Sequence, residues 1–125
     1  MTESGSNIRA GIASVVQRTR PAKAAAAVVA AHFLGDTAVF VLGEESLLFV
    51  PRDGETRTVG AHAGAILSSA AQDDRVVTGG DDGTVVATGA DGASTTLATD
   101  GKRRWIDHVA MGPNRAVAWS AEEST

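Results

Sequence analysis

The sequence predicts an all-β protein built of short antiparallel strands, and three observations favour this fold class. Short apolar runs alternate with turn signals along most of the chain. Fourteen glycines among 125 residues fall mainly in those turn signals, where a tight turn needs a residue that tolerates positive φ. Residues also recur at a fixed spacing: Ile66, Ala70, Arg75 and Val77 return forty positions later as Ile106, Ala110, Arg115 and Val117. A period of about forty residues made of short strands indicates repeats that stack or fan around an axis.

Residues 1–23 form a segment of different composition, and we expect a short helix or a disordered arm there. A stripe of apolar residues at helical spacing ends at Pro21. The stripe consists of Ile8, Ile12, Val15 and Val16. A secretory signal is the alternative, with residues 24–31 as its apolar part, but that run is mostly alanine and begins more than twenty residues into the chain.

From residue 24 onward the chain divides into strand-sized pieces separated by Gly, Pro, Asn and Asp. The expected strands are 26–32, 37–42, 46–50 and 55–59, then 65–71, 75–78, 84–88 and 94–98, then 105–111 and 116–120. The Gly-Gly-Asp-Asp-Gly run at 79–83 is expected to be a hairpin turn, because no Lys-Ser/Thr pair follows it as in a phosphate-binding loop.

Aligning the first two repeats gives a spacing of 37 residues over 39–48, where Val39, Gly43 and Leu48 match Val76, Gly80 and Val85. The Asp53-Gly54 turn then matches Asp91-Gly92 at a spacing of 38. Four short strands in each period are typical of a β-propeller blade. We therefore expect an incomplete propeller over 24–125, with blades at about 24–60 and 61–100 and a partial blade at 101–125.

Ala61-His62 in the middle repeat is followed by Thr78 and then by Asp82. In these residues the middle repeat resembles the WD-repeat β-propellers, which have a Gly-His pair at the place of Ala61-His62. The phrases at 105–110 and 116–120 are similar to those of bacterial members with degenerate repeats. The resemblance implies a structural hydrogen-bond network of His62, Thr78 and Asp82. The Trp that completes this network in the family is replaced by Thr88.

The outer repeats depart further from the family pattern. The 37-residue alignment puts Val41 and Glu45 at the Thr and Asp places of the first repeat, and the forty-residue spacing puts Ala118 at the Thr place of the third. Two and a half blades cannot close a ring, so we expect the amino-terminal part of a larger propeller, or self-association through an open edge at 116–120.

Composition and spacing argue against several kinds of chemistry. The net charge of −4 offers no basis for binding nucleic acid or an anionic membrane, and no run approaches the ~18 apolar residues of a membrane-spanning helix. The chain has no cysteine, and His32, His62 and His108 lack the spacing of metal ligands. The basic-aromatic run at 102–105 is either a small contact site or a solvated loop whose Trp105 packs under the next strand.

We therefore expect a non-catalytic, cytoplasmic WD-repeat-like scaffold that binds a protein partner through a loop face, with no cofactor, no metal and no catalytic residues. Two alternatives remain open. The chain is a fragment of a propeller enzyme or ligand-binding subunit whose active residues lie in other blades, or it is a truncated gene product without a function of its own.

Overall fold

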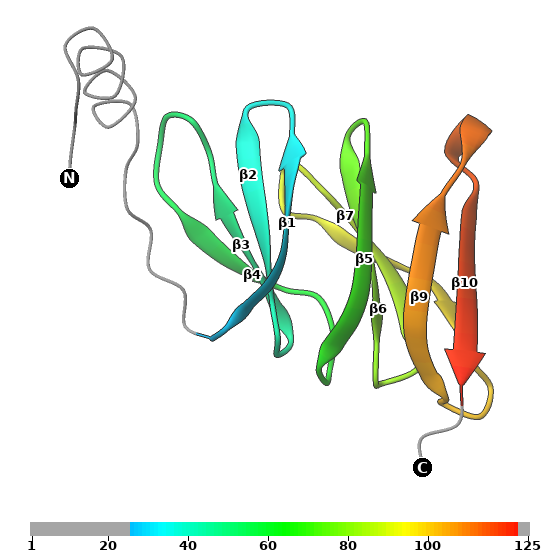
Figure 1. Ribbon diagram of the computed structural model, residues 1–125. Helices are drawn as coiled ribbons and strands as arrows, with labels where there is room; N and C mark the ends of the chain where they lie inside the picture. Colours follow the sequence, from blue (N-terminus) through cyan, green and yellow to red (C-terminus); the bar gives the residue numbers. More distant parts are fainter. Residues whose placement is uncertain (1–25, 123–125) are drawn as a thin grey trace, which may run out of the picture.

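The computed structural model describes residues 26–122 and shows an all-β architecture of three antiparallel sheets (Figure 1). The expected arm at 1–23 lies outside the described residues. The strand order within each sheet follows the chain, so every sheet is a meander. The predictions of an all-β fold and of antiparallel meanders are confirmed.

The ten strands of the described part lie close to the predicted ones. The first sheet contains β1 (Val28–Leu34), β2 (Thr37–Leu42), β3 (Ser46–Val50) and β4 (Arg57–Gly60). The second sheet contains β5 (Ile66–Gln72), β6 (Arg75–Gly80), β7 (Thr84–Gly89) and β8 (Ser94–Thr99). The third sheet contains β9 (Trp105–Met111) and β10 (Val117–Glu122), joined through the short 3-10 helix η1 (Pro113–Arg115).

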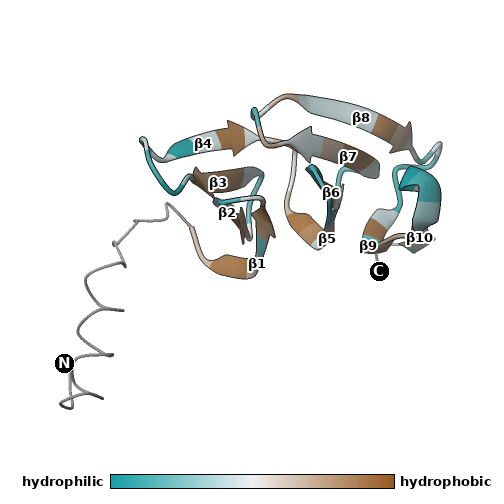
Figure 2. Ribbon diagram, turned by 90° about the horizontal axis from the view of Figure 1, so that it is seen from above, coloured by the Kyte–Doolittle hydropathy of each residue, from teal (hydrophilic) through white to brown (hydrophobic). Residues whose placement is uncertain are grey.

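The three sheets lie side by side, with their first strands on a common side of the molecule (Figure 2). We call β1, β5 and β9 the inner strands; β1 contacts β5, and β5 contacts β9. The outer strands β4 and β8 lie on the opposite side (Figure 2).

Two apolar clusters hold the sheets together. The first core cluster joins the first and second sheets, and the second core cluster joins the second and third. The buried members of the first are Leu34, Val39, Val41, Leu47, Phe49, Ile66 and Val76. Those of the second are Val77, Val85, Ala87 and Ile106. Both faces of the second sheet are therefore covered.

The strand register corrects the predicted alignment of the first two repeats by one residue. Ala31 pairs with Phe40 in the first sheet, and Ser69 pairs with Thr78 in the second, so equivalent positions are 38 residues apart and not 37. The predicted alignment was anchored on the glycines of two turns. In the structure Gly80 is the last residue of β6, whereas Gly43 lies beyond the end of β2.

The third repeat follows the forty-residue spacing only along its inner strand. Ala70 pairs with Val77, but Ala110 pairs with Ala118, because the connection between β9 and β10 is one residue longer. Val77 is therefore equivalent to Ala118 and not to Val117. The position equivalent to Thr78 is occupied by Phe40 in the first sheet and by Trp119 in the third. The predictions of Val41 and Ala118 at this position are therefore wrong.

Candidate functional site

The structure brings together the three residues predicted to form a network. His62 precedes β5, Thr78 lies on β6, and Asp82 lies in the turn between β6 and β7. His62 Nε2 lies 2.7 Å from Thr78 Oγ1, and His62 Nδ1 lies 3.0 Å from Asp82 Oδ1. The His62 side chain is fully buried.

The Asp82 carboxylate determines the direction of the hydrogen bonds in this network. Because a carboxylate can only accept, the Nδ1–H of His62 donates to Asp82, and Nε2 shares a hydrogen bond with the Thr78 hydroxyl, which also lies 3.4 Å from Val86 O. Loss of hydration raises the pKa of Asp82. Hydrogen bonds from the Ala63 amide, His62 and Thr84 outweigh that effect and hold the pKa below its usual value.

Gly80 and Thr88 are the next residues to consider around the network. An ideal Cβ added to Gly80 would lie 2.5 Å from His62 Nδ1, so this position has room only for glycine. Thr88, at the place of the family's Trp, is fully buried, and its hydroxyl bonds to Ser94 Oγ at 2.9 Å instead of extending the network.

The equivalent junction between the second and third sheets depends on Asp100. The amide of Asp100 donates to Gly83 O, as the amides of Ala61 and His62 both donate to Glu45 O, so Asp100 lies at the place of the Ala61-His62 pair. The Asp100 carboxylate accepts from the Lys102 and Arg104 amides and from the Arg104 guanidinium at 2.8 Å. The Arg104 side chain holds the pKa of Asp100 far below its usual value. Sequence reasoning missed this residue, although an Asp at the start of a polar loop is a recognised turn signal.

The structure separates the parts of the basic-aromatic run at 102–105. Arg104 pairs with Asp100, and the Arg103 guanidinium lies 3.4 Å from Asp82 O. Trp105 keeps 41% of its surface exposed. The expectation that Trp105 packs under the next strand is therefore wrong.

Each inner strand carries a β-bulge at the same level. In β5, Ile66 pairs with Gly80 and Ser68 with Gly79, which leaves Leu67 as an extra residue. Val29 is the extra residue in β1, and Asp107 is the extra residue in β9. A bulge inserts a residue that has no partner and redirects its side chain. The alternation of strand residues does not reveal such an insertion.

The bulge also sets which sheet the flanking residues face. Ile66 and Ser68 are two positions apart, yet Ile66 belongs to the first core cluster while Ser68 Oγ donates to Ile106 O of the third sheet at 3.0 Å. Ser69 faces the first sheet, where its hydroxyl lies 2.8 Å from His32 Nε2. The strand β5 therefore contacts both neighbouring inner strands.

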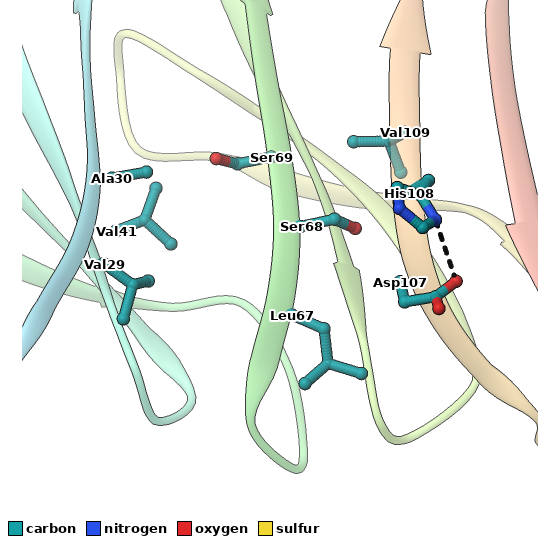
Figure 3. Close-up of a pocket in the computed structure, with 9 residues that line it drawn as sticks. All are labelled: Val29, Ala30, Val41, Leu67, Ser68, Ser69, Asp107, His108 and Val109. Carbon is teal, nitrogen blue, oxygen red and sulfur yellow. Dashed lines mark ion pairs between the residues drawn. The ribbon is translucent and has the colours of Figure 1, made fainter. Parts of the chain in front are cut away.

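The three bulges line a pocket of about 320 Å³ between the inner strands (Figure 3). Its lining is about equally polar and apolar, with aliphatic side chains, two hydroxyls in the middle and an acidic corner on β9. The lining residues are Val29, Ala30, Val41, Leu67, Ser68, Ser69, Asp107, His108 and Val109.

Asp107 organises the acidic corner of the pocket. Its Oδ1 lies 3.2 Å from His108 Nδ1 and accepts from Ser120 Oγ at 3.1 Å. Loss of hydration raises the pKa of Asp107, but hydrogen bonds from Glu122 and Ser120 outweigh it, and the pKa lies below its usual value. The pKa of Glu122 is raised because it shares a hydrogen bond with Asp107.

This corner does not have the geometry of a proton relay. Ser120 Oγ and Asp107 Oδ1 lie 3.3 Å and 3.2 Å from the same nitrogen of His108, Nδ1. A catalytic triad needs the hydroxyl and the carboxylate on opposite ring nitrogens.

Residues 26–122 contain no group of His, Asp and Glu side chains placed to hold a metal ion. Over the same range, no helix has the length and apolar character needed to cross a membrane.

Comparison with protein-family models and with curated proteins returns no match for this chain. The resemblance to WD-repeat propellers therefore stays a prediction, and the function has to be argued from the geometry above.

Proposed function

We propose that this chain is a non-catalytic, WD-repeat-like interaction module. In this proposal the three sheets are blades of a partial β-propeller, and the turns at one end bind a protein partner. Support comes from the common register of the first two sheets, the polar junction at His62, and the placement of the inner strands side by side.

The turns that we assign to the partner lie at the same end of the three sheets (Figure 1). We call this end the turn face. It consists of residues 35–36, 51–56, 73–74, 90–93 and 112–116. Exposed charged residues are abundant on it, including Arg52 and Asp36.

Contacts between neighbouring sheets fix the turn face, and this observation carries the proposal. Arg115 pairs with Asp74 at 3.1 Å, and Arg75 donates to Arg115 O at 2.7 Å, which joins the second and third sheets. Arg57 donates to Ala90 O at 3.0 Å, which joins the first and second. A surface whose loops are already ordered loses less entropy on binding.

Affinity capture with matched charge reversals tests this proposal. Arg52→Glu changes the turn face, and Lys102→Glu changes an exposed residue at the opposite end. We expect a captured protein to be lost with Arg52→Glu and kept with Lys102→Glu. Equal capture by both variants, or capture no greater than by heat-unfolded protein, would contradict the proposal.

The second candidate function is a ligand-binding subunit, and the pocket between the inner strands favours it. The pocket combines aliphatic side chains with a carboxylate at one corner. This combination is typical of sites that orient a small ligand.

A further inference from the structure

The pocket between the inner strands offers a ligand one carboxylate, that of Asp107. The two serines are already used to join strands, because Ser68 donates to Ile106 O and Ser69 bonds to His32. Asp107 is different. A carboxylate has about four acceptor positions, and the contacts with Ser120, His108 and Glu122 use three of them at most. Asp107 can therefore accept a further hydrogen bond.

The charge balance at Asp107 favours a cation. Glu122 and His108 are the ionisable groups that act on it, and among residues 26–122 no Lys or Arg forms an ion pair with it. The Asp107 side chain is only 26% exposed, so attraction to a cation is screened less by water than at an open surface. A carboxylate in this position attracts a positively charged donor.

The remaining walls fit an apolar stem. Val29 and Leu67 are the extra residues of two bulges, and Val41 and Val109 complete the apolar lining. Figure 3 shows Leu67 between the Val29 side and Asp107. The volume of about 320 Å³ is at the lower end of the range of ligand pockets, about 300–1,000 Å³. The pocket therefore suits a short chain rather than a large ring system.

We propose that this pocket binds a primary ammonium group carried on an unbranched apolar stem, with Asp107 accepting from the ammonium and Val29 and Leu67 packing on the stem. A lysine side chain of a protein and a free alkylamine both carry this chemistry. The inference depends on the pocket alone and does not require the proposed interaction function.

Nuclear magnetic resonance titration of the whole chain with n-pentylammonium tests the proposal, and n-pentanol is the uncharged control of the same length. We expect amide shifts at the pocket residues with n-pentylammonium at millimolar concentration and at least tenfold weaker binding of n-pentanol. Equal binding of the two compounds, no binding, or shifts confined to other surfaces would overturn the inference. This comparison uses the unmodified protein and does not depend on the folding of a variant.

Substitutions then test the two parts of the site. Asp107→Asn, which keeps the shape of the side chain, should weaken n-pentylammonium binding at least tenfold, and Leu67→Ser should weaken it several-fold. Asp53→Asn, on the exposed loop between β3 and β4, should leave it unchanged. Unchanged binding by Asp107→Asn with a native spectrum would also overturn the inference.

A blocked Gly-Lys-Gly peptide distinguishes the two sources of the ligand. Binding of this peptide at least as tight as that of n-pentylammonium supports a lysine side chain of a protein. Binding of the amine alone supports a free alkylamine. Failure of both would overturn the inference but leave the turn face and its charge-reversal test unaffected.

Discussion

At the residue scale, the buried His62 side chain joins the loop before β5 to Thr78 on β6 and to Asp82 in the following turn. Removing its ring takes away the shorter contact of the fully buried Thr78 hydroxyl and leaves only the one of 3.4 Å to Val86 O. We expect His62→Ala to lower the free energy of unfolding by about 1–3 kcal/mol.

Urea denaturation measures this loss. The matched control is His108→Ala, because the His108 side chain is 78% exposed and its loss should cost little. A loss near zero for His62→Ala would show that the network does not contribute to stability.

Asp82 makes the stability of the same network depend on pH. Its pKa in the folded protein is below the unfolded value of about 3.9. A group with a depressed folded pKa contributes stability that is present above the unfolded pKa and is lost as the pH falls through the folded pKa. We expect the urea concentration at the midpoint of unfolding to decrease as the pH is lowered below about 4.

The variant Asp82→Asn isolates this contribution from those of Asp74, Asp100 and Asp107, whose pKa values are also lowered. It should be less stable than the native protein at pH 7 and should lose less stability on acidification. Parallel pH profiles of the two proteins would assign the acid sensitivity to the other carboxylates.

Substitution of Gly80 tests whether the His62 imidazole occupies a fixed position. A methyl group at this position would overlap both His62 and Asp82, whereas a methyl group at Gly60 would meet no atom within 4 Å. Gly80→Ala should cost about 1–3 kcal/mol, typical of overpacking, and Gly60→Ala should cost less than 1 kcal/mol, as expected where nothing is displaced. Calorimetry on the two variants compares them directly, and similar losses would argue against a fixed position for the imidazole.

At the scale of the elements, β10 is the strand whose surroundings differ most from those of its equivalents. Within the described residues it pairs with β9 alone, whereas β2 and β6 each lie between two strands. Trp119 on this strand is 45% exposed. An unpaired strand edge with a large exposed apolar side chain promotes pairing with another chain.

We therefore expect residues 1–125 alone to self-associate through β10 and to lack the behaviour of a compact stable monomer. Trp119→Lys should reduce the apparent mass in light scattering, because a charge on an edge strand opposes pairing. Leu97→Lys on β8 tests the choice of strand, since Leu97 is 41% exposed and also lies on an edge strand; a larger reduction with this variant would assign the association to β8 and not to β10. A monodisperse particle of 12.7 kDa would contradict this expectation.

The elements were predictable from the sequence because turn residues and apolar alternation define short strands well. The register of the strands was not predictable in this way. Gly79-Gly80 looks like part of a turn, but both glycines belong to β6, where an added Cβ would overlap Ile106 or His62. Close packing between distant segments required those glycines, and one sequence does not reveal such a requirement.

The two candidate sites also differ in how far the sequence predicted them. The resemblance led to His62, Thr78 and Asp82 because these residues stand at positions of the family's motif. The pocket was not found, since Val29 and Leu67 read as ordinary strand residues and Asp107 as an isolated acid. A bulge adds one residue without any composition signal, so only the register of the neighbouring strand shows it.

At the scale of the whole molecule, we expect the second sheet to be the most stable part, because it packs against both neighbouring sheets. It contributes fully buried side chains to both faces, including Val76, Val77 and Val85. In the described part of the third sheet, Ile106 is the one buried residue. We expect hydrogen exchange to be slowest in β6 and β7 and clearly faster in β10. Equal protection of β10 and β6 would indicate that the third sheet is covered in solution.

The aligned bulges separate the residues that fold the protein from those that could change its ligand. Deleting Leu67 would join Ile66 to Ser68 and leave each on the face it already occupies, so both core clusters would keep their members. Val29, Leu67 and Asp107 are thus three places where a side chain can vary without altering a strand partner. An engineer could exchange all three to give the pocket a new charge or shape while the sheets stay the same, and natural divergence has the same freedom.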